Sequence, residues 1–297
     1  MPVSALMVLA TFLFATMGVC VKLASGLYGT GEIVFYRGLI GATMLFIVSR
    51  VRGGTLRTGV PGMHFWRSLT GVTALCMWFY SIGNLPLATS MTLNYMSSVW
   101  MALFLIGGAV ALGTTRVDGK VVATILLGFG GVALVLRPTI DQQQLWHGLV
   151  GLISGMISAT AYLQVTALGR AGEPEYRTVF YFSLGGVVAG AGMTLINDGF
   201  HAHTWKGAAL LIAVGLLATT AQLLMTRAYA TGRTLVNASL QYLGIAFAFG
   251  YGVLLFDDPV TWMALAGMAL IIGAGVAATM LRTKVTNKTD TTIMNET

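Results

Sequence analysis

The stretch that decides the fold is residues 31–41, Gly-Glu-Ile-Val-Phe-Tyr-Arg-Gly-Leu-Ile-Gly, which opens an apolar run that continues to Val48. Arg37 lies inside this run, and its neighbours three and four positions away are apolar residues or glycine. Glu32 is five positions back, so on a helix it points to a different side. A charge within a membrane-length helix is costly and usually faces a bundle interior or a wet cavity. The partner of Arg37 is therefore expected on another segment or on a ligand.

The composition of the whole chain indicates a lipid environment. Of its 297 residues, 56% are apolar and 9% are charged, and the mean hydropathy is +0.79. Soluble domains carry roughly 25% charged residues, so this chain lacks the side chains needed to cover a water-exposed surface. The 2 cysteines lie in apolar runs and predict neither a disulfide framework nor a zinc site. We interpret the chain as an all-α, polytopic membrane protein.

Apolar stretches of roughly 17–25 residues predict ten transmembrane helices. Their ranges are 3–24, 32–50, 64–82, 88–111, 120–136, 148–168, 178–196, 207–227, 235–256 and 260–281. The connections between them are short, which leaves no room for a soluble catalytic domain. Residues 282–297 are polar and rich in Thr, Asn and Lys, which predicts a disordered cytoplasmic tail.

The basic residues predict the orientation in the membrane. With the N-terminus in the cytoplasm, the cytoplasmic segments and span ends hold thirteen Lys and Arg residues, Arg67 among them, whereas the opposite side holds Lys22, Arg137 and Lys206. This positive-inside bias predicts a multi-pass protein of the inner, cytoplasmic membrane with both termini in the cytoplasm. The net charge of +7 is then spread over loops at one membrane face, which argues against a nucleic-acid partner.

Sequence matches at similar offsets indicate an internal repeat. The Phe-Tyr pair at residues 35–36 recurs 145 residues later at 180–181, residues 92–95 recur 147 residues later at 239–242, and the Gly-Val-Ala at 131–133 recurs 144 residues later at 275–277. Each half would hold five helices, an odd number, so the second half enters the membrane from the opposite side. The prediction is two inverted five-helix repeats, residues 1–143 and 144–281, which is typical of secondary transporters. An ancient duplication in a channel or membrane enzyme is the alternative.

The two five-helix repeats, the glycine-rich closing helices and the chain length resemble the drug/metabolite transporter superfamily, specifically its EamA-type permeases. The resemblance covers residues 1–281, and Arg37 is similar to an arginine common in the second helix of that family. Asp258 is similar to the acid that the family often places after its ninth helix. The resemblance implies transport of amino acids, organic acids, nucleotide-related metabolites or drugs, and it does not fix the substrate.

Arg37 is the first candidate for substrate binding. As a fixed positive charge it would attract a carboxylate or phosphate group. Two other interpretations are a side chain that snorkels to the outer membrane interface, and a gating ion pair with Glu32 or Asp258 of another helix. Glu32 and Asp258 are accordingly candidates for gating or coupling.

Amides and aromatic rings within the predicted spans complete the candidate site. The pairs Asn94-Tyr95 and Gln241-Tyr242 occupy matching places in the two halves, where they would contact substrate or tie helices together. Gln164 and Gln222 have the same ambiguity. The deep aromatic residues would wall an apolar cavity or simply pack, and they are Trp78, Trp100 and Tyr162.

The sequence thus predicts a secondary transporter that moves a small metabolite, such as an amino acid, an organic acid or a related amphipathic compound, by alternating access. The alternative is an integral-membrane enzyme or channel acting on a lipid-linked or small polar substrate. The sequence lacks hydrolase, metalloprotease and phosphate-cradling motifs, so no catalytic residue, metal or other cofactor is expected. Expected partners are a small-molecule substrate and membrane lipids, in a monomer or homodimer. No acidic residue falls in the middle of a span, which argues against a proton relay through a central carboxylate. Coupling to an ion, exchange and facilitated movement remain the alternatives.

Overall fold

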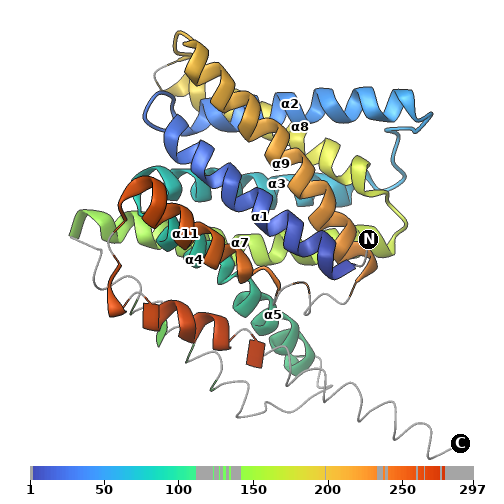
Figure 1. The fold of residues 1–297 in the computed structure, drawn as a ribbon. Coiled ribbons are helices and arrows are strands. Elements are labelled where there is room, and N and C mark those ends of the chain that lie inside the picture. The colour runs from blue at the N-terminus through green and yellow to red at the C-terminus, as the bar shows by residue number, and fades with distance from the viewer. Residues whose placement is uncertain are drawn as a thin grey trace, which may run out of the picture.

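The computed structural model describes residues 3–111, 142–197, 199–232, 240–258, 260–263, 265–274 and 276–277, together with isolated positions at 123, 127, 130, 131, 134 and 237. These residues form helices and turns, with no strand among them (Figure 1). The bounded helices are α1 (Val3–Ala24), α2 (Thr30–Val51), α3 (Pro61–Asn84), α4 (Leu87–Tyr95), α5 (Ser97–Ala111), α7 (Gln142–Arg170), α8 (Glu175–Ile196), α9 (Trp205–Thr231) and α11 (Leu243–Phe256).

The helices follow the apolar stretches closely. Helix α1 has the predicted bounds, and α2, α3, α7, α8 and α9 extend the predicted spans by a few residues at one or both ends. Within the described residues, five helices (α1, α2, α7, α8 and α9) are long and apolar enough to cross a membrane, and Leu243–Phe256 and Leu265–Ala274 are shorter apolar helices. The all-α, multi-pass membrane class is therefore confirmed. Most of the predicted span 120–136, part of 260–281 and the whole tail 282–297 lie outside the described residues.

The faces of the helices show a membrane pattern of burial. In α8 the large apolar side chains of Leu184, Val188 and Leu195 are 43%, 69% and 70% exposed, while Gly186 and Gly190 are buried. Lipid solvates large apolar side chains, so helices gain little by hiding them, and small residues gather where backbones approach. The exposed apolar face of α8 therefore suits a lipid environment.

Helices α2 and α8 cross at van der Waals contact of their backbones. A Cβ atom on Gly38 would lie 2.6 Å from the carbonyl oxygen of Ser183, and a Cβ on Gly190 would collide with the backbone nitrogen of Phe35. Any larger residue would push the two backbones apart. The glycines thus set the distance between two helices that carry Arg37 and Phe182.

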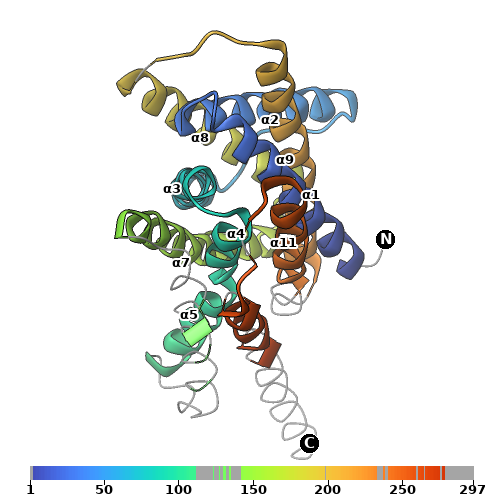
Figure 2. The same ribbon diagram turned by 60° about the vertical axis from the view of Figure 1, so that its left-hand side comes forward.

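The helix pairs come from distant parts of the chain. The most extensive contacts join α2 to α8, α1 to α9 and α3 to α7, and α4 packs on both α7 and α11. Helix α11 also packs on α1. Figures 1 and 2 both show α5 lying to one side of this bundle, below α4 and α7.

The predicted single span 88–111 is wrong in one respect, because it is interrupted at Met96 between α4 and α5. The hydroxyl of Thr92 donates a hydrogen bond of 2.6 Å to the carbonyl of Ala88, a side-chain-to-backbone bond that often bends helices. The predicted span 235–256 has a turn at residues 241–242 before α11 begins. Both interruptions fall beside the amide and tyrosine pairs Asn94-Tyr95 and Gln241-Tyr242.

Candidate functional site

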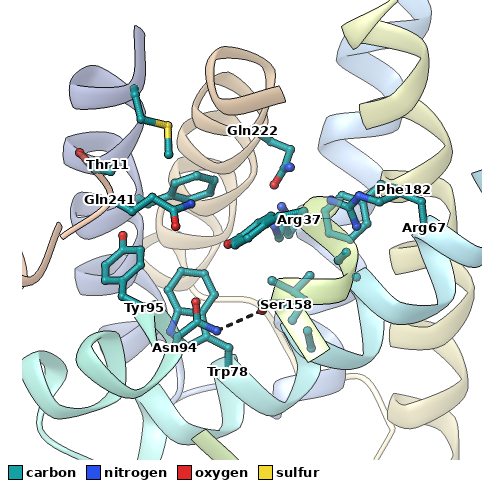
Figure 3. Close-up of a pocket in the computed structure, with 17 residues that line it drawn as sticks. Thr11, Arg37, Arg67, Trp78, Asn94, Tyr95, Ser158, Phe182, Gln222 and Gln241 are labelled. Atoms are coloured by element: carbon teal, nitrogen blue, oxygen red, sulfur yellow. Dashed lines mark hydrogen bonds between the residues drawn. The ribbon is translucent and has the colours of Figure 1, made fainter. Parts of the chain in front are cut away.

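A buried cavity lies where α1, α2, α3, α4, α7, α8, α9 and the turn before α11 meet (Figure 3). About 580 Å³ of space between atoms, open solvent included, lies among its lining residues. Its lining comprises Met7, Thr11, Phe14, Arg37, Arg67, Gly71, Ala74, Leu75, Trp78, Asn94, Tyr95, Ser158, Ala161, Tyr162, Phe182, Gln222 and Gln241. None of these lining residues is acidic, and two of them are arginines.

Arg37 and Arg67 face each other around the ring of Phe182 (Figure 3). The Cζ atoms of Arg37 and Arg67 lie 4.9 Å and 4.4 Å from the centre of that ring, and each residue is only 3% exposed. The burial of Arg37 shows that the snorkelling interpretation is wrong. The predicted repeat pairs Phe182 with Arg37, at an offset of 145 residues, and these two side chains are in contact.

Neither guanidinium donates a hydrogen bond or forms an ion pair with any described residue. The Nε atom of Arg37 and the Nε and Nη1 atoms of Arg67 are buried without a partner. Cation–π contact with Phe182 offsets part of this cost, by about 0.5–2 kcal/mol for each arginine. The site therefore presents two buried cations, three of whose nitrogen atoms have no hydrogen-bond partner.

The two cations also repel each other. Their Cζ atoms are no farther apart than the sum of the 4.9 Å and 4.4 Å distances to the shared ring. At an effective dielectric constant of roughly 20, even this largest possible separation corresponds to a repulsion of about 2 kcal/mol, so the repulsion is at least of that size. Such an arrangement is costly when empty and favours the binding of negative charge.

Gly71 makes room for one of these cations. A Cβ atom at Gly71 would collide with Nη1 of Arg67, one helical turn earlier in α3. Because Gly71 lacks that atom, the guanidinium of Arg67 lies against its own helix and turns toward the cavity. The position of Arg67 thus depends on a glycine four residues away.

Asn94 and Gln241, the two amides that the predicted repeat would pair, have different surroundings. The side-chain nitrogen of Asn94 donates to Ser154 at 2.9 Å and to Ser158 at 3.4 Å, which ties α4 to α7 (Figure 3). Gln241 donates a weak bond to the sulfur of Met225 at 3.6 Å and also hydrogen-bonds to Tyr162, whereas its Oε1 atom is buried without a hydrogen-bond partner. Asn94 therefore has a clear structural role, whereas Gln241 has a free acceptor at the cavity.

The two further glutamines also differ. Gln222 lines the cavity and its Nε2 atom has no hydrogen-bond partner. Gln164 accepts a hydrogen bond of 2.8 Å from Thr70 and joins α7 to α3 away from the cavity lining. Gln222 thus joins the candidate binding groups, and Gln164 ties two helices together.

The predicted aromatic residues divide into two groups. Trp78, Tyr95 and Tyr162 line the cavity, and the ring of Tyr162 stacks on Tyr229 with centroids 5.5 Å apart. Trp100 and Tyr242 are not among the lining residues. Trp100 stacks instead on Phe104 within α5, with centroids 6.3 Å apart, and Tyr242 is buried at the turn before α11.

Glu32 and Asp258 do not form the predicted ion pair with Arg37. Glu32 is 1% exposed and contacts the imidazole Nδ1 of His201 at 2.8 Å, which holds the α8–α9 loop against α2. The carboxylate of Asp258 accepts a hydrogen bond of 3.0 Å from the backbone nitrogen of Leu87 and so joins the end of α11 to the start of α4. Burial raises the pKa of Asp258, and nearby Lys22 opposes this effect.

A third polar cluster lies near the end of α2 and the start of α8, at the opposite ends of these helices from the Glu32–His201 contact. Glu173, in the α7–α8 loop, contacts Arg177 at 2.9 Å and His64 at 3.1 Å, and it accepts a hydrogen bond from Thr58 at 3.0 Å. Burial alone would raise the pKa of Glu173, but the hydrogen bonds from Arg177, His64 and Thr58 outweigh it and hold this pKa below its ordinary value. The cluster ties the start of α3 to the start of α8.

Arg67 is the residue that the sequence interpretation placed wrongly. The count of basic residues assigned it to the cytoplasmic end of its span, but it is buried in α3 and lines the cavity. The positive-inside count then falls by one, to twelve against three. The available signal was Gly71, four positions later, which a surface arginine would not require.

A helical membrane bundle with a largely apolar cavity that holds a few charged and polar groups between its helices is the architecture of a small-molecule transporter. No protein-family model matches the chain. The chain is 32% identical over 280 residues to the pseudopaline exporter CntI of Pseudomonas aeruginosa, covering 94% of this chain and 95% of the exporter. It is also 26% identical over 229 residues to the riboflavin transporter of Rhizobium johnstonii, covering 77% and 74% of the two chains.

These similarities, together with 22% identity to mouse solute carrier family 35 member G1 over 93% of this chain and 77% of that protein, show the family. The chain belongs to the drug/metabolite transporter superfamily, as the resemblance implied. It is a secondary transporter of small metabolites. A solved crystal structure superposes with a TM-score of 0.70 at 17% identity, covering 95% of this chain and 98% of that one, and it shows the shared fold.

Proposed function

We propose that the chain exports an anionic or zwitterionic metabolite by alternating access, with Arg37 as the central charge that binds it. The observation that carries this proposal is the burial of Arg37 at the cavity without an acidic partner. A buried cation is strongly destabilising unless something compensates it, and a substrate carboxylate would do so. The direction is proposed from the similarity to a protein named as an exporter.

The transporting unit that we propose consists of ten helices in two inverted repeats, residues 1–143 and 144–281. The pairing of helices supports it. Exchanging α1 with α7, α2 with α8, α3 with α9 and α4 with α11 maps the most extensive contacts onto one another, since α1–α9 becomes α7–α3 and α1–α11 becomes α7–α4. The pairs α2–α8 and α4–α11 map onto themselves. The matching interruptions beside Asn94 and Gln241 agree with the same two-fold relation.

The polar clusters at the helix ends fit the role of gates in this mechanism. With both termini in the cytoplasm, as the positive-inside bias favours, Glu32–His201 and Asp258–Leu87 lie toward the outer side and the Glu173 cluster lies toward the cytoplasm. Opening to either side would break the contacts of that side. Alternating access requires such interactions to break in turn while the halves rock about the cavity.

Exchange or facilitated movement fits the cavity better than a central proton relay. A relay of that kind would need a carboxylate beside the substrate, and no Asp or Glu is among the lining residues. Histidine is absent from the lining as well. The charge needed for binding is supplied by arginine, which stays protonated at physiological pH.

Counterflow into proteoliposomes tests the proposal. Purified protein would be reconstituted and a panel of radiolabelled amino acids and organic acids offered against the same unlabelled compounds. We expect saturable uptake of at least one carboxylate compound, and its loss in Arg37→Gln. Arg50→Gln is the matched control, because Arg50 lies on the same helix and also over a phenylalanine ring but is exposed. Linear, non-saturable flux, or normal transport by Arg37→Gln, would contradict the proposal.

A further inference from the structure

We infer that the cavity binds a substrate with two carboxylate groups, one held by Arg37 and the other by Arg67. This inference rests on the proposed function and adds a second binding residue and a substrate class to it. Both arginines are 3% exposed, both line the cavity, and both have buried nitrogen atoms without a partner.

The chemistry of the guanidinium group argues for two anionic groups. A guanidinium is a planar fork whose paired N–H groups match the two oxygens of one carboxylate. A single carboxylate therefore saturates one fork and leaves the second cation buried and uncompensated. A compound with two carboxylates neutralises both forks at once.

The shared ring of Phe182 sets the spacing of the two groups. The Cζ atoms lie 4.9 Å and 4.4 Å from its centre, so the two carboxylate sites are neighbours within one cavity. A flexible chain of a few carbon atoms is long enough to bridge them. The inferred ligand is a short dicarboxylate or a larger molecule that contains such a unit.

Neutral polar groups face the rest of the ligand. Oε1 of Gln241 is a buried acceptor without a partner and Nε2 of Gln222 is a buried donor without one. Because no acidic residue lines the cavity, an amino group on the ligand would meet amide and hydroxyl oxygens and would find no carboxylate. The indole of Trp78 adds an apolar wall.

Binding to the purified full-length protein in detergent tests the inference. The probes are glutarate and adipate as dicarboxylates, butyrate as a monocarboxylate of similar length, and inorganic phosphate as one compact anion, all at equal ionic strength. Dissociation constants would be measured by calorimetry and checked by thermal shift. In the wild type we expect glutarate or adipate to bind on the order of 10 to 100 times more tightly than butyrate, the usual effect of one extra charge-assisted pair.

The variants separate the two arginines. Arg67→Gln should bind glutarate and butyrate about equally, with the butyrate constant within about threefold of wild type. Arg67→Lys keeps the positive charge but lacks the paired N–H donors of a guanidinium. Its preference for glutarate over butyrate should lie between those of the wild type and Arg67→Gln. Arg50→Gln should behave as wild type because Arg50 is exposed, outside the cavity. If Arg67→Gln does not elute as a monodisperse peak in size-exclusion chromatography, the variant is set aside. The inference is then tested by the relative affinities of the wild type for glutarate and butyrate.

Equal wild-type affinity for glutarate and butyrate would overturn the inference, as would tighter binding of phosphate than of both dicarboxylates. An equal loss of both ligands in Arg67→Gln would also overturn it, because Arg67 would then not act on a second group. In each of these cases, continued dependence of butyrate binding on Arg37 would leave the proposed central anion site intact. If none of the carboxylates binds and Arg37→Gln transports normally, the proposed function itself is wrong.

Discussion

The repulsion between Arg37 and Arg67 gives a quantitative prediction for the empty protein. Both side chains are buried over one ring, at 4.9 Å and 4.4 Å from its centre. With an effective dielectric constant of roughly 20, the repulsion is about 2 kcal/mol. Replacing either arginine by glutamine removes this repulsion completely. Replacing the second arginine as well therefore gives no further stabilisation from its relief.

A double-mutant cycle isolates this pairwise energy from the other effects of each substitution. The free energy of unfolding would be measured for the wild type, Arg37→Gln, Arg67→Gln and the double variant, by equilibrium unfolding in mixed micelles without added anions. We expect the change in the double variant to be about 2 kcal/mol less favourable than the sum of the two single changes. Cation–π losses cancel in the cycle to the extent that each ring contact is independent.

The control cycle pairs Arg37→Gln with Arg50→Gln. These residues are thirteen positions apart on α2, roughly 20 Å along the helix axis, and Arg50 is exposed. Their effects should add within about 0.5 kcal/mol. If the effects of Arg37→Gln and Arg67→Gln on the free energy of unfolding also add within about 0.5 kcal/mol, the reasoning is refuted. Two charged arginines this close together in the interior would have to show a larger coupling energy. Added glutarate should reduce the measured coupling by bridging the pair.

Three further substitutions have direct tests, and the two glycine substitutions have matched controls. Gly71→Ala places a methyl group where the buried guanidinium of α3 lies, so the affinity for glutarate should fall about tenfold, whereas Gly62→Ala in open space on the same helix should not change it. Gly190→Ala drives a methyl group into the backbone of α2 and should lower the free energy of unfolding by about 1–3 kcal/mol, whereas Gly192→Ala should change it little; similar values for both would disprove the close crossing. The hydrogen-bonded, lowered pKa of Glu173 means that its carboxylate stabilises the fold above the ordinary carboxyl pKa, and that this stability is lost as the pH falls through the lowered value. Thermal melts of Glu173→Gln should therefore lack this acid-dependent loss and start from a lower melting temperature at neutral pH.

The sequence by itself determined the class of the protein and most of its helices. The apolar runs determine helices α1, α2, α3, α7, α8 and α9 because backbone groups in lipid must be satisfied within each segment, which is a local requirement. The position of Arg37 within one of these apolar runs likewise predicts a buried charge that needs a partner. The resemblance to a transporter family added the expected activity, which the similar proteins support.

Only the tertiary structure decided which side chains share the cavity. Trp100 and Tyr242 are close in sequence to Asn94 and Gln241, yet they lie outside the lining. Trp100 follows the interruption at Met96, and Tyr242 lies in the turn at residues 241–242. The interruption at Met96 carries no proline or glycine that would have predicted it. Side-chain hydroxyls that bond to backbone carbonyls produce bends that composition does not reveal.

Arg67 shows most clearly what the sequence could not decide. An arginine near the start of an apolar span can face the cytoplasm or turn into the bundle, and a count of charges treats both alike. The choice depends on the space beside Gly71 and on the ring of Phe182, which comes from α8, more than one hundred residues along the chain. The pairing of the two cations is a contact between distant segments, and such contacts are set by packing, which no local pattern encodes.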